Sequence, residues 1–339
     1  MRSFSDSLNL LTKISPGKLL NASRVLSSYY ISRINGKPNH WGLPFSIGIE
    51  PTTACNLRCP ECPSGLRSFS RPTGNLSSDT FIKVIDQLSG HLIYLTFYFQ
   101  GEPYLNPKFL DMVSYASGKG IYTSTSTNAH YLDKTTAKKT IESGLDRIII
   151  SIDGADQETY QQYRVGGSYE KVIKGTKELL SARRKMSSKK PHVAFQFLVV
   201  KPNEHHINAI SRLGKDLGVD EILFKTAQIY EFENGSSLIP EQERFSRYHK
   251  TGKGTWEIKN SLENHCWKMW HSCVITWDGA VVPCCFDKDA GHAMGNINEK
   301  TFKEIWEGEK YRNFRESLLS SRKEIDICRN CTEGTTVWI

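Results

Sequence analysis

The chain has 339 residues, of which 38% are hydrophobic and 24% charged, a composition typical of a globular protein with one large domain or two medium ones. No apolar run approaches the roughly 20 residues of a membrane-spanning helix. Lys13, Pro16 and Lys18 interrupt the apolar stretch 8–20, which argues against a secretory signal. Nine cysteines in such a chain favour metal binding or catalysis over disulfides, so we expect a reducing, cytoplasmic location.

The net charge of +8 is distributed unevenly along the chain. Residues 1–40 carry six basic side chains and a single acidic one, Asp6, and a second basic cluster spans residues 183–190. Basic segments can bind nucleic acid or an anionic membrane surface. No recognisable nucleic-acid-binding module accompanies them, so we expect solvated surface and no nucleic-acid partner. The alternative is that the basic N-terminal residues tether the protein to an anionic surface.

Residues 1–44 are predicted to form a helical N-terminal extension. Between residues 21 and 34, apolar side chains recur at near-helical spacing, which predicts a helix that packs on the main body. The side chains that define this face are Val25, Leu26, Tyr29, Tyr30 and Ile34.

Residues 45–226 alternate between strand-like and helix-like segments. Six βα units of about 30 residues each predict an α/β fold, in which a parallel sheet curves into a partial (β/α)6 barrel. The predicted helices lie near 79–88, 106–118, 133–143, 168–186 and 204–217. The predicted strands are 45–50, 92–99, 122–127, 147–152, 193–200 and 221–226.

Two further segments follow the predicted barrel. Residues 227–262 contain Gly, Ser, Pro and charged residues without a long apolar period, and we interpret them as a linker. Residues 263–339 are predicted to form a separate C-terminal module, because they hold six of the nine cysteines. These are Cys266, Cys273, Cys284, Cys285, Cys328 and Cys331.

The candidate functional motifs coincide with the ends of predicted strands. Parallel α/β barrels place their active sites at the C-terminal ends of their strands, so this agreement in position is stronger than any single motif. In chain order, the motifs after the first four strands are Cys55-x3-Cys59-x2-Cys62, Gly101-Glu102-Pro103, Asn128, and Ser151 with Asp153.

The cysteine triad is informative because no fourth cysteine lies nearby in the sequence. A structural zinc site requires four ligands, and an electron-transfer cluster normally has four cysteines. Three thiolates suit three irons of a cubane cluster and leave the fourth iron open to another ligand. The alternative is a zinc site completed by a distant residue.

In the C-terminal module, alternating β-forming residues around the 278–279 turn predict a β-hairpin. If Trp277 pairs with Ala280, Cys273 lies opposite Cys284 on one face of the hairpin. Four cysteine ligands would suit either an iron–sulfur cluster or a structural zinc ion. The geometry leaves two ligand sets open, namely Cys284, Cys328 and Cys331 with either Cys273 or Cys266.

Together with Gly101-Glu102-Pro103, the cysteine triad resembles the radical S-adenosylmethionine (radical SAM) superfamily. The resemblance implies that Cys55, Cys59 and Cys62 bind a [4Fe–4S] cluster whose open iron binds S-adenosylmethionine. Reductive cleavage of this cofactor would give a 5′-deoxyadenosyl radical that abstracts a hydrogen atom from a substrate. The residues implied to contact S-adenosylmethionine are Gly101, Glu102, Pro103, Asn128, Ser151, Asp153 and Arg164.

The C-terminal module resembles the SPASM/twitch domains that follow radical SAM barrels. The resemblance rests on Cys266-x12-Gly279-x4-Cys284 and the later Cys328-x2-Cys331. It selects Cys266 over Cys273 and leaves Cys273 and Cys285 as free thiols. The implied ligands of one auxiliary [4Fe–4S] cluster are Cys266, Cys284, Cys328 and Cys331.

These resemblances predict a radical SAM oxidoreductase or maturase that oxidises or modifies a peptide or a small molecule. We expect S-adenosylmethionine as cofactor and an electron donor such as a flavodoxin or a ferredoxin as partner. The competing interpretation is a non-catalytic scaffold that binds zinc or a structural cluster.

Overall fold

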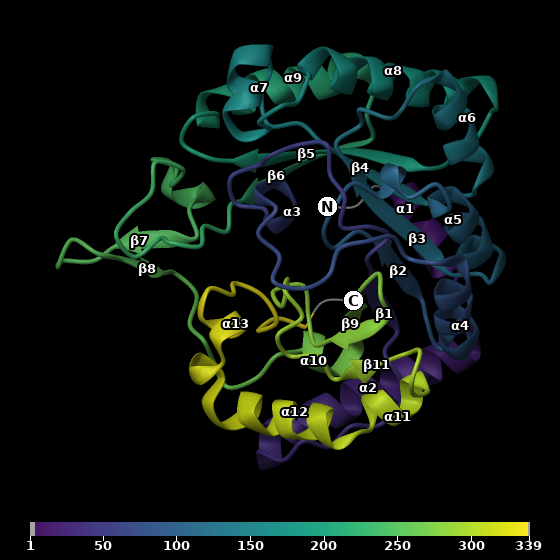
Figure 1. Cartoon of the computed structure of the whole chain (residues 1–339), viewed down its shortest axis with the longest axis vertical. Coiled ribbons are helices and arrows are strands. Elements are labelled where there is room, and N and C mark those ends of the chain that lie inside the picture. The colour runs from purple at the N-terminus through teal and green to yellow at the C-terminus, as the bar shows by residue number, and fades with distance from the viewer. Residues whose placement is uncertain (1–3, 338–339) are drawn as a thin grey trace.

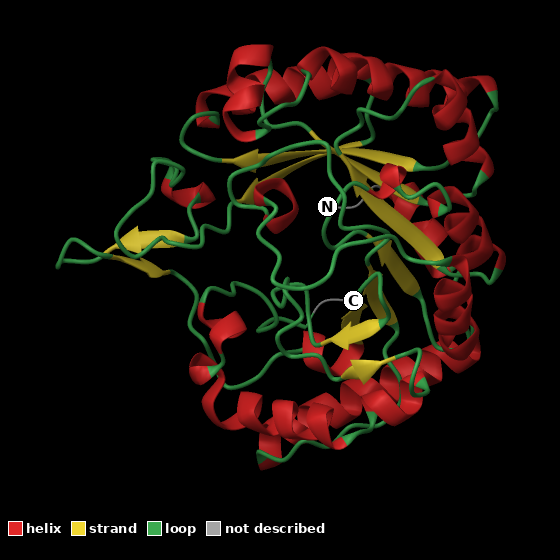
Figure 2. Cartoon of the chain, in the orientation of Figure 1, coloured by secondary structure: helices red, strands yellow, loops and turns green. Residues whose placement is uncertain are grey.

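The computed structural model describes residues 4–337 and contains a nine-stranded sheet with helices along its outer face (Figures 1 and 2). Six consecutive strands run parallel and follow one another in sequence order across the sheet. Each ends within two residues of its predicted end, and the predicted partial (β/α)6 barrel is confirmed. The strands are β1 (Ser46–Ile49), β2 (Tyr94–Phe97), β3 (Tyr122–Thr127), β4 (Arg147–Ser151), β5 (His192–Val199) and β6 (Glu221–Thr226).

The helices that connect these strands cover the outside of the barrel (Figure 2). A seven-residue helix, α7 (Gln157–Tyr163), was not predicted, because it is too short for an apolar period and is set mainly by its N-cap, Asp156. The four-residue α3 (Pro63–Leu66) was missed because it is also too short for an apolar period. The predicted helices are observed as α4 (Ser78–Leu88), α5 (Phe109–Gly118), α6 (Lys134–Glu142), α8 (Tyr169–Lys185) and α9 (Ile207–Leu217).

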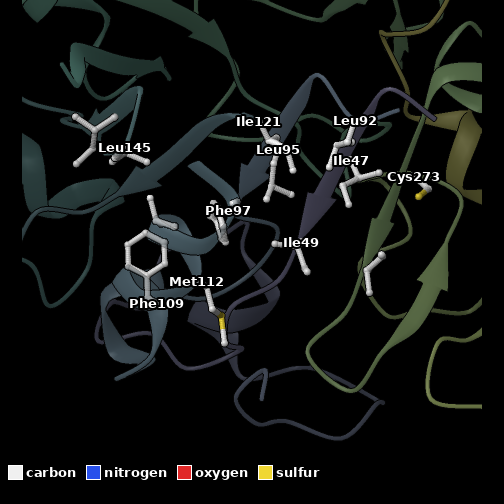
Figure 3. Packing of buried hydrophobic residues seen from close by; sticks show 14 of the residues in the cluster. Ile47, Ile49, Leu92, Leu95, Phe97, Phe109, Met112, Ile121, Leu145 and Cys273 are labelled. Atoms are coloured by element: carbon white, nitrogen blue, oxygen red, sulfur yellow. The ribbon is translucent and has the colours of Figure 1, made fainter. Parts of the chain in front are cut away.

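The main hydrophobic core lies between the sheet and these helices (Figure 3). Ile47 and Ile49 of β1 and Leu95 and Phe97 of β2 are fully buried in it. Successive side chains of a strand point to opposite faces, so the intervening residues of each strand face the barrel interior. The core therefore fixes the outer face of the sheet and leaves the inner face available for polar side chains.

The C-terminal module continues the barrel sheet. Its first strand, β9 (Ser272–Ile275), pairs in parallel with β1, and β10 (Ala280–Val282) and β11 (Gly295–Asn296) follow on the same edge. The module's helices are α10 (Lys268–His271), α11 (Phe302–Trp306), α12 (Glu309–Ser321) and α13 (Asp326–Arg329). The sheet order β11-β10-β9-β1 makes barrel and module one continuous structure.

The predicted hairpin is present between β9 and β10, but the predicted register is wrong by one residue. The backbone N–H of Thr276 donates to the carbonyl of Ala280 at 2.9 Å, so Trp277 does not pair with Ala280. Gly279 lies in the left-handed region, with φ of 86°. The turn therefore has three residues, the last of them a glycine, instead of two.

This shift changes the environment of Cys273. A slip of one residue moves every side chain of a strand to the other face, so Cys273 does not lie opposite Cys284 as predicted. Cys273 is instead paired with Ile47 of β1 and is buried in the main core. Figure 3 shows it among the core side chains.

The N-terminal residues form two helices, α1 (Phe4–Leu11) and α2 (Pro16–Asn35). Helix α1 is held at the N-terminal ends of the strands by Asp6, whose carboxylate accepts hydrogen bonds from Tyr122 and Arg147. Helix α2 packs against α10 and buries Val25 and Tyr29 completely. The prediction that Tyr30 and Ile34 belong to the same packed face is wrong, because both side chains are exposed.

Residues 227–262, predicted as a linker, include a small hairpin of β7 (Tyr248–Lys250) and β8 (Trp256–Ile258). Ile229 and Tyr248 are buried in a second hydrophobic cluster that also contains Leu57 and Cys59. The Tyr248 hydroxyl donates to Asn330 at 2.9 Å. This segment thus packs over the cysteine triad and ties it to the C-terminal module. No helix among the described residues is long and apolar enough to cross a membrane.

Candidate active site

The cysteine triad occupies the loop that follows β1, at the C-terminal end of the strand. Cys59 is buried, and Cys55 and Cys62 are half-buried. Cys62 directly precedes α3, and the backbone of Cys59 lies so close to Gly65 that a Cβ there would be 2.6 Å from the Cys59 nitrogen. The glycine lets α3 pack directly against the backbone of the cysteine loop.

Gly101-Glu102-Pro103 is attached directly to this loop. Gly101 has a φ of 75°, and a Cβ at this position would lie 2.2 Å from the Thr52 carbonyl oxygen, so only glycine fits. The Gly101 N–H donates to Ser64 Oγ at 2.8 Å, and the Glu102 N–H donates to the Ala54 carbonyl at 2.8 Å. The backbone of the motif and the cysteine loop therefore form one rigid unit.

The Glu102 carboxylate is directed at the end of β3. It accepts hydrogen bonds from Thr127 Oγ1 at 2.7 Å and from the Asn128 N–H at 2.7 Å. Burial raises its pKa to about 7, against the stabilising effect of these hydrogen bonds on the charged form. Asn128 in turn donates from Nδ2 to Asn56 Oδ1 in the cysteine loop at 2.8 Å. These contacts place the motifs after β1, β2 and β3 together.

Arg164 and Asp153 form a buried ion pair beside the triad. The Arg164 guanidinium also lies 3.7 Å from Cys59 Sγ, so it places a positive charge next to one thiol of the loop. The other oxygen of Asp153 accepts from the Leu198 N–H at 2.7 Å. Ser151 is buried at the end of β4 and pairs with Gln196 of β5. Arg164 and Asp153 are thus satisfied by protein groups, and their contact with S-adenosylmethionine stays a prediction.

Four of the six C-terminal cysteines line one enclosed cavity. Arg322, Lys268 and Glu333 also line it, and the rest of its wall is mainly apolar. Cys273 and Cys285 do not contribute to it. The lining cysteines are Cys266, Cys284, Cys328 and Cys331, the set implied by the SPASM resemblance.

Four cysteine thiols around one cavity are a complete protein ligand set for an iron–sulfur cubane. A structural zinc ion takes the same four-cysteine set, with each sulfur about 2.3 Å from the metal. The cysteines would supply thiolate ligands, and the apolar wall would limit the access of water.

Arg322 was not identified from the sequence. Its guanidinium is fully buried, 3.5 Å from Cys331 Sγ, and it donates to the carbonyls of His265 at 2.9 Å and Glu333 at 2.7 Å. Burial lowers the pKa of Arg322, but the combined attraction to Cys266, Cys331 and Cys328 outweighs this effect, so the pKa is raised on balance. A single arginine at a helix end carries no sequence signal, and only the fold brings it to the cysteines.

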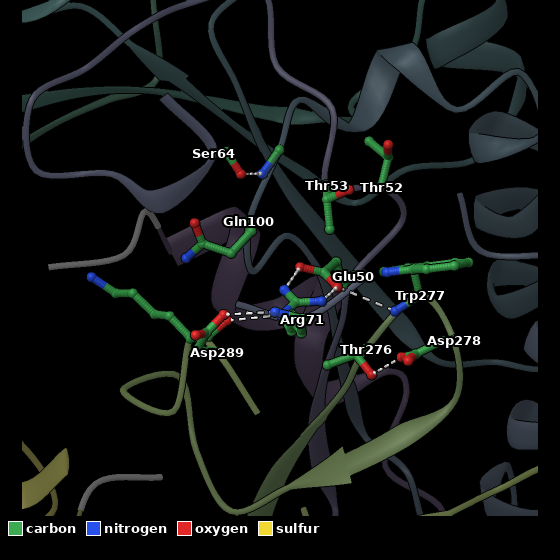
Figure 4. Close-up of polar contacts among 12 residues, drawn as sticks. Glu50, Thr52, Thr53, Ser64, Arg71, Gln100, Thr276, Trp277, Asp278 and Asp289 are labelled. Atoms are coloured by element: carbon green, nitrogen blue, oxygen red, sulfur yellow. Dashed lines mark hydrogen bonds and ion pairs between the residues drawn. The ribbon is translucent and has the colours of Figure 1, made fainter. Parts of the chain in front are cut away.

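A second group missed from the sequence joins the cysteine loop to the C-terminal module (Figure 4). Arg71 makes a two-pronged ion pair with the fully buried Glu50 at the end of β1, at 2.9 and 2.6 Å. Glu50 also accepts from the Trp277 N–H at 3.2 Å. Arg71 Nε donates to the Lys288 carbonyl at 3.0 Å, and Asp289 accepts from the Ser70 N–H at 2.9 Å. These contacts fix the position of the segment after the cysteine loop relative to the C-terminal module.

Comparison with known proteins agrees with this arrangement. A radical SAM superfamily model matches residues 49–210, and an iron–sulfur cluster-binding (SPASM) domain matches residues 266–332. The chain is 26% identical over 327 residues to a tungsten-containing aldehyde ferredoxin oxidoreductase cofactor-modifying protein of Pyrococcus furiosus, covering 84% of this chain and 86% of that protein. It is also 26% identical over 313 residues to an AdoMet-dependent heme synthase of Methanosarcina barkeri, covering 80% of this chain and 85% of that protein.

The same fold occurs in the crystal structure of Streptococcus suis SuiB bound to S-adenosylmethionine. The two structures superpose with a TM-score of 0.65 at 14% identity, over 93% of this chain and 77% of that chain. The likeness shows the fold, and the two matched family models define the class of protein as a radical SAM barrel followed by an iron–sulfur cluster-binding domain.

The chain belongs to the radical SAM superfamily and carries a C-terminal SPASM domain. Its cofactors are accordingly a [4Fe–4S] cluster with S-adenosylmethionine and auxiliary iron–sulfur. Because the radical SAM model matches the barrel and two matched relatives are named as an AdoMet-dependent heme synthase and an Fe-coproporphyrin III synthase, the interpretation as a non-catalytic scaffold is set aside.

Proposed function

We propose that the enzyme abstracts a hydrogen atom from a small acidic molecule bound between the cysteine loop of the barrel and the C-terminal module. The observation that carries the proposal is the position of Lys288. Its ammonium donates to the Tyr230 hydroxyl at 2.7 Å and to Gln228 Oε1 at 3.3 Å. It lies close enough to both Cys62 and Cys285 for their thiolates to raise its pKa, against the larger lowering effect of burial. A cation between the two cysteine regions favours an anionic substrate group.

Two further cations support an acidic substrate. Lys268 pairs with Glu333 and lies 4.0 Å from Cys285 Sγ. Arg247 donates from Nε to Thr226 Oγ1 at 2.9 Å at the end of β6, while its Nη1 is buried without a hydrogen-bond partner among the described residues. A buried guanidinium N–H without a partner is costly, and a substrate carboxylate would satisfy it.

A small molecule fits this region better than a peptide. Residues 227–262 pack over the cysteine loop through the second hydrophobic cluster, and Arg71 joins the segment after that loop to Glu50 and to the Lys288 carbonyl. Both contacts limit the space through which an extended chain could pass.

In this proposal Cys55, Cys59 and Cys62 hold the catalytic cluster, and Cys266, Cys284, Cys328 and Cys331 hold one auxiliary cluster. When bound, the catalytic cluster supplies the electron that cleaves S-adenosylmethionine to the 5′-deoxyadenosyl radical. Gly101 and Pro103 shape the backbone that faces the cofactor. Glu102 and Asn128 orient that backbone, and Arg164 supplies positive charge beside Cys59. The external electron would come from a flavodoxin or a ferredoxin.

The test measures iron and acid-labile sulfide per chain after anaerobic reconstitution, together with 5′-deoxyadenosine formation under dithionite. The wild type should hold about eight irons, and the Cys55→Ala/Cys59→Ala/Cys62→Ala variant about four. The variant should form no 5′-deoxyadenosine. A triple variant that kept all its iron, or that still cleaved S-adenosylmethionine, would contradict the proposed catalytic site.

The acidic character of the substrate is tested separately. Small-molecule extract is fractionated by anion exchange, and each fraction is assayed for stimulation of 5′-deoxyadenosine formation. The stimulating fraction should be retained by the exchanger, and the Lys288→Gln variant should lose the stimulation while keeping the basal rate. Stimulation found only in the unretained fraction would rule out an anionic substrate.

A further inference from the structure

Helix α2 buries several polar side chains against the body of the protein and exposes several apolar side chains to solvent. The side chains that it buries against the body include the polar Lys18, Asn21, Ser28 and Ser32. On the opposite face, Ile34 is 85% exposed, and Leu19 and Leu20 are 58% and 55% exposed. With 3.6 residues per turn, the exposed apolar residues fall within an arc of roughly 120°. This apolar stripe consists of Leu19, Leu20, Tyr30, Ile31 and Ile34.

The buried polar face is satisfied within the protein, so α2 is not displaced from its position. Asn21 exchanges hydrogen bonds with the backbone of Leu43 at 2.8 and 3.0 Å, and Lys18 Nζ donates to the Gly120 carbonyl at 2.8 Å. Val25 and Tyr29 are fully buried on the same side. The apolar stripe therefore faces away from the body of the protein. An exposed apolar surface of this kind marks a site of interaction with a membrane or another molecule.

Helix α1 repeats the pattern. Phe4, Leu8 and Leu11 are exposed and follow i, i+4, i+7 spacing, which puts them on one face of the helix. The only acidic residue of α1, Asp6, points the other way and is buried in its ion pair with Arg147. Both N-terminal helices thus combine an internal polar contact with an external apolar stripe.

The charged side chains beside the apolar stripe are all basic. Arg24, Arg33 and Lys37 are exposed along α2 and just after it. No acidic residue occurs between Asp6 and Glu50, and both of these carboxylates are buried in ion pairs. Exposed Leu, Ile and Tyr accompanied by basic and uncharged polar residues, with no acidic residue on the helix, are typical of a helix that lies in the interface of an anionic membrane.

We propose that the α1–α2 surface binds an anionic lipid bilayer, with α2 parallel to the membrane plane and the apolar stripe inserted at the level of the headgroups. Arg24, Arg33 and Lys37 would contact lipid phosphates. Figure 1 shows α2 along the molecular edge away from α7, α8 and α9, so a membrane there leaves those helices free of lipid. The inference is independent of the proposed reaction, because it rests on surface residues outside the cysteine sites.

The test is co-sedimentation of the reconstituted holoprotein with vesicles of phosphatidylcholine alone or with one lipid in three replaced by phosphatidylglycerol. The wild type should pellet with the anionic vesicles and be released by high salt. Leu19→Ser/Leu20→Ser/Ile34→Ser and Arg24→Gln/Arg33→Gln/Lys37→Gln should each lower the partition coefficient at least about tenfold. Iron content and 5′-deoxyadenosine formation in solution should not change in either variant.

Two matched variants serve as controls. Ile82→Ser/Met186→Ser removes exposed apolar side chains elsewhere, and Lys134→Gln/Lys174→Gln/Lys177→Gln removes the same charge from α6 and α8; both should pellet like the wild type. Equal sedimentation of wild type and the serine variant, or no preference for anionic vesicles, would overturn the proposal. A loss of self-association in the serine variant without vesicle binding would assign the stripe to a second copy of the chain.

Discussion

At the scale of single residues, each proposed cluster site pairs a buried guanidinium with a cysteine thiol. Arg164 lies 3.7 Å from Cys59 Sγ, and Arg322 lies 3.5 Å from Cys331 Sγ. Burial is the main cause that raises the pKa of Cys55 and of Cys328 to about 12, because a thiolate loses its hydration in an apolar site, and neighbouring cysteines raise it too. Nearby positive charge offsets part of this penalty and helps the thiols to bind metal as thiolates.

Replacement of Arg322 by methionine should weaken the auxiliary site. The carbonyls of His265 and Glu333 lose their donor, which should lower the free energy of unfolding by about 3 kcal/mol. Loss of a positive charge should also lower the reduction potential of the auxiliary cluster by about 50 to 100 mV, since an added electron is less favoured. A redox titration followed by electron paramagnetic resonance measures the shift. Arg312→Met, on the exposed side of α12, should change neither property.

Gly101→Ala tests the close contact between the Gly-Glu-Pro turn and the cysteine loop. The new Cβ would overlap the Thr52 carbonyl, and the left-handed φ adds strain, so we expect a loss of at least about 2 kcal/mol in unfolding free energy. Binding of S-adenosylmethionine, measured by equilibrium dialysis, should weaken as well. Gly118→Ala in α5, where a Cβ meets nothing within 4 Å, should leave both unchanged; equal effects of the two substitutions would show that the contact is unimportant.

At the scale of elements, the sequence predicted what is encoded locally. The six barrel strands are short segments that contain β-branched, aromatic or other apolar residues and alternate with helical segments, and the triad and Gly101–Pro103 are short motifs, so both were found. The pairing of β9 with β1 joins segments from opposite ends of the chain and has no local signal. The hairpin register failed because the positive φ of Gly279 adds a residue to the turn. The Arg71–Glu50 pair and Arg322 were missed because only folding brings the partners together.

The corrected register predicts different behaviour for the two cysteines that the sequence left as alternatives. Cys266→Ala should remove about four irons per chain, because this side chain lines the cavity of the C-terminal module. Cys273→Ala should keep all the iron and lose only about 1 to 2 kcal/mol of stability, because its side chain packs beside β1. Parallel iron assays and denaturant titrations measure both. Loss of iron in Cys273→Ala would show that the ligand set is wrong.

At the scale of the whole molecule, barrel, module and N-terminal helices share one packing interface. Tyr29 of α2 contacts Trp267 and Trp270 around α10, with ring centroids 5.1 and 5.5 Å apart. His271, at the end of α10, stacks on Phe45 just before β1, with ring centroids 5.2 Å apart. Because the same aromatic side chains contact all three parts, the stability of this interface should govern the cooperative unfolding of the protein.

This interface should make stability depend on pH through His271. Burial, with a smaller contribution from nearby Lys268, lowers its pKa to about 4 against the opposing effect of a hydrogen bond to the Trp267 backbone. The unfolded chain has a pKa near 6.5, so as the pH falls below that value the unfolded state gains a proton that the folded state does not. The contribution of His271 is therefore complete above about pH 6.5 and should decrease by about 2 kcal/mol between pH 7 and pH 5.

Anaerobic denaturant titrations of the holoprotein at pH 7, 6 and 5 measure this effect. Phenylalanine keeps the stacking on Phe45 and cannot be protonated, so His271→Phe should flatten the pH dependence even where it changes stability at pH 7. His249→Asn, at an exposed position on β7, should retain the wild-type slope. Parallel slopes for wild type and His271→Phe would mean that His271 is protonated in the folded protein or that its burial does not control stability. A flattened slope would identify the contact between α10 and β1 as the acid-sensitive part of the interface that joins the SPASM domain to the barrel.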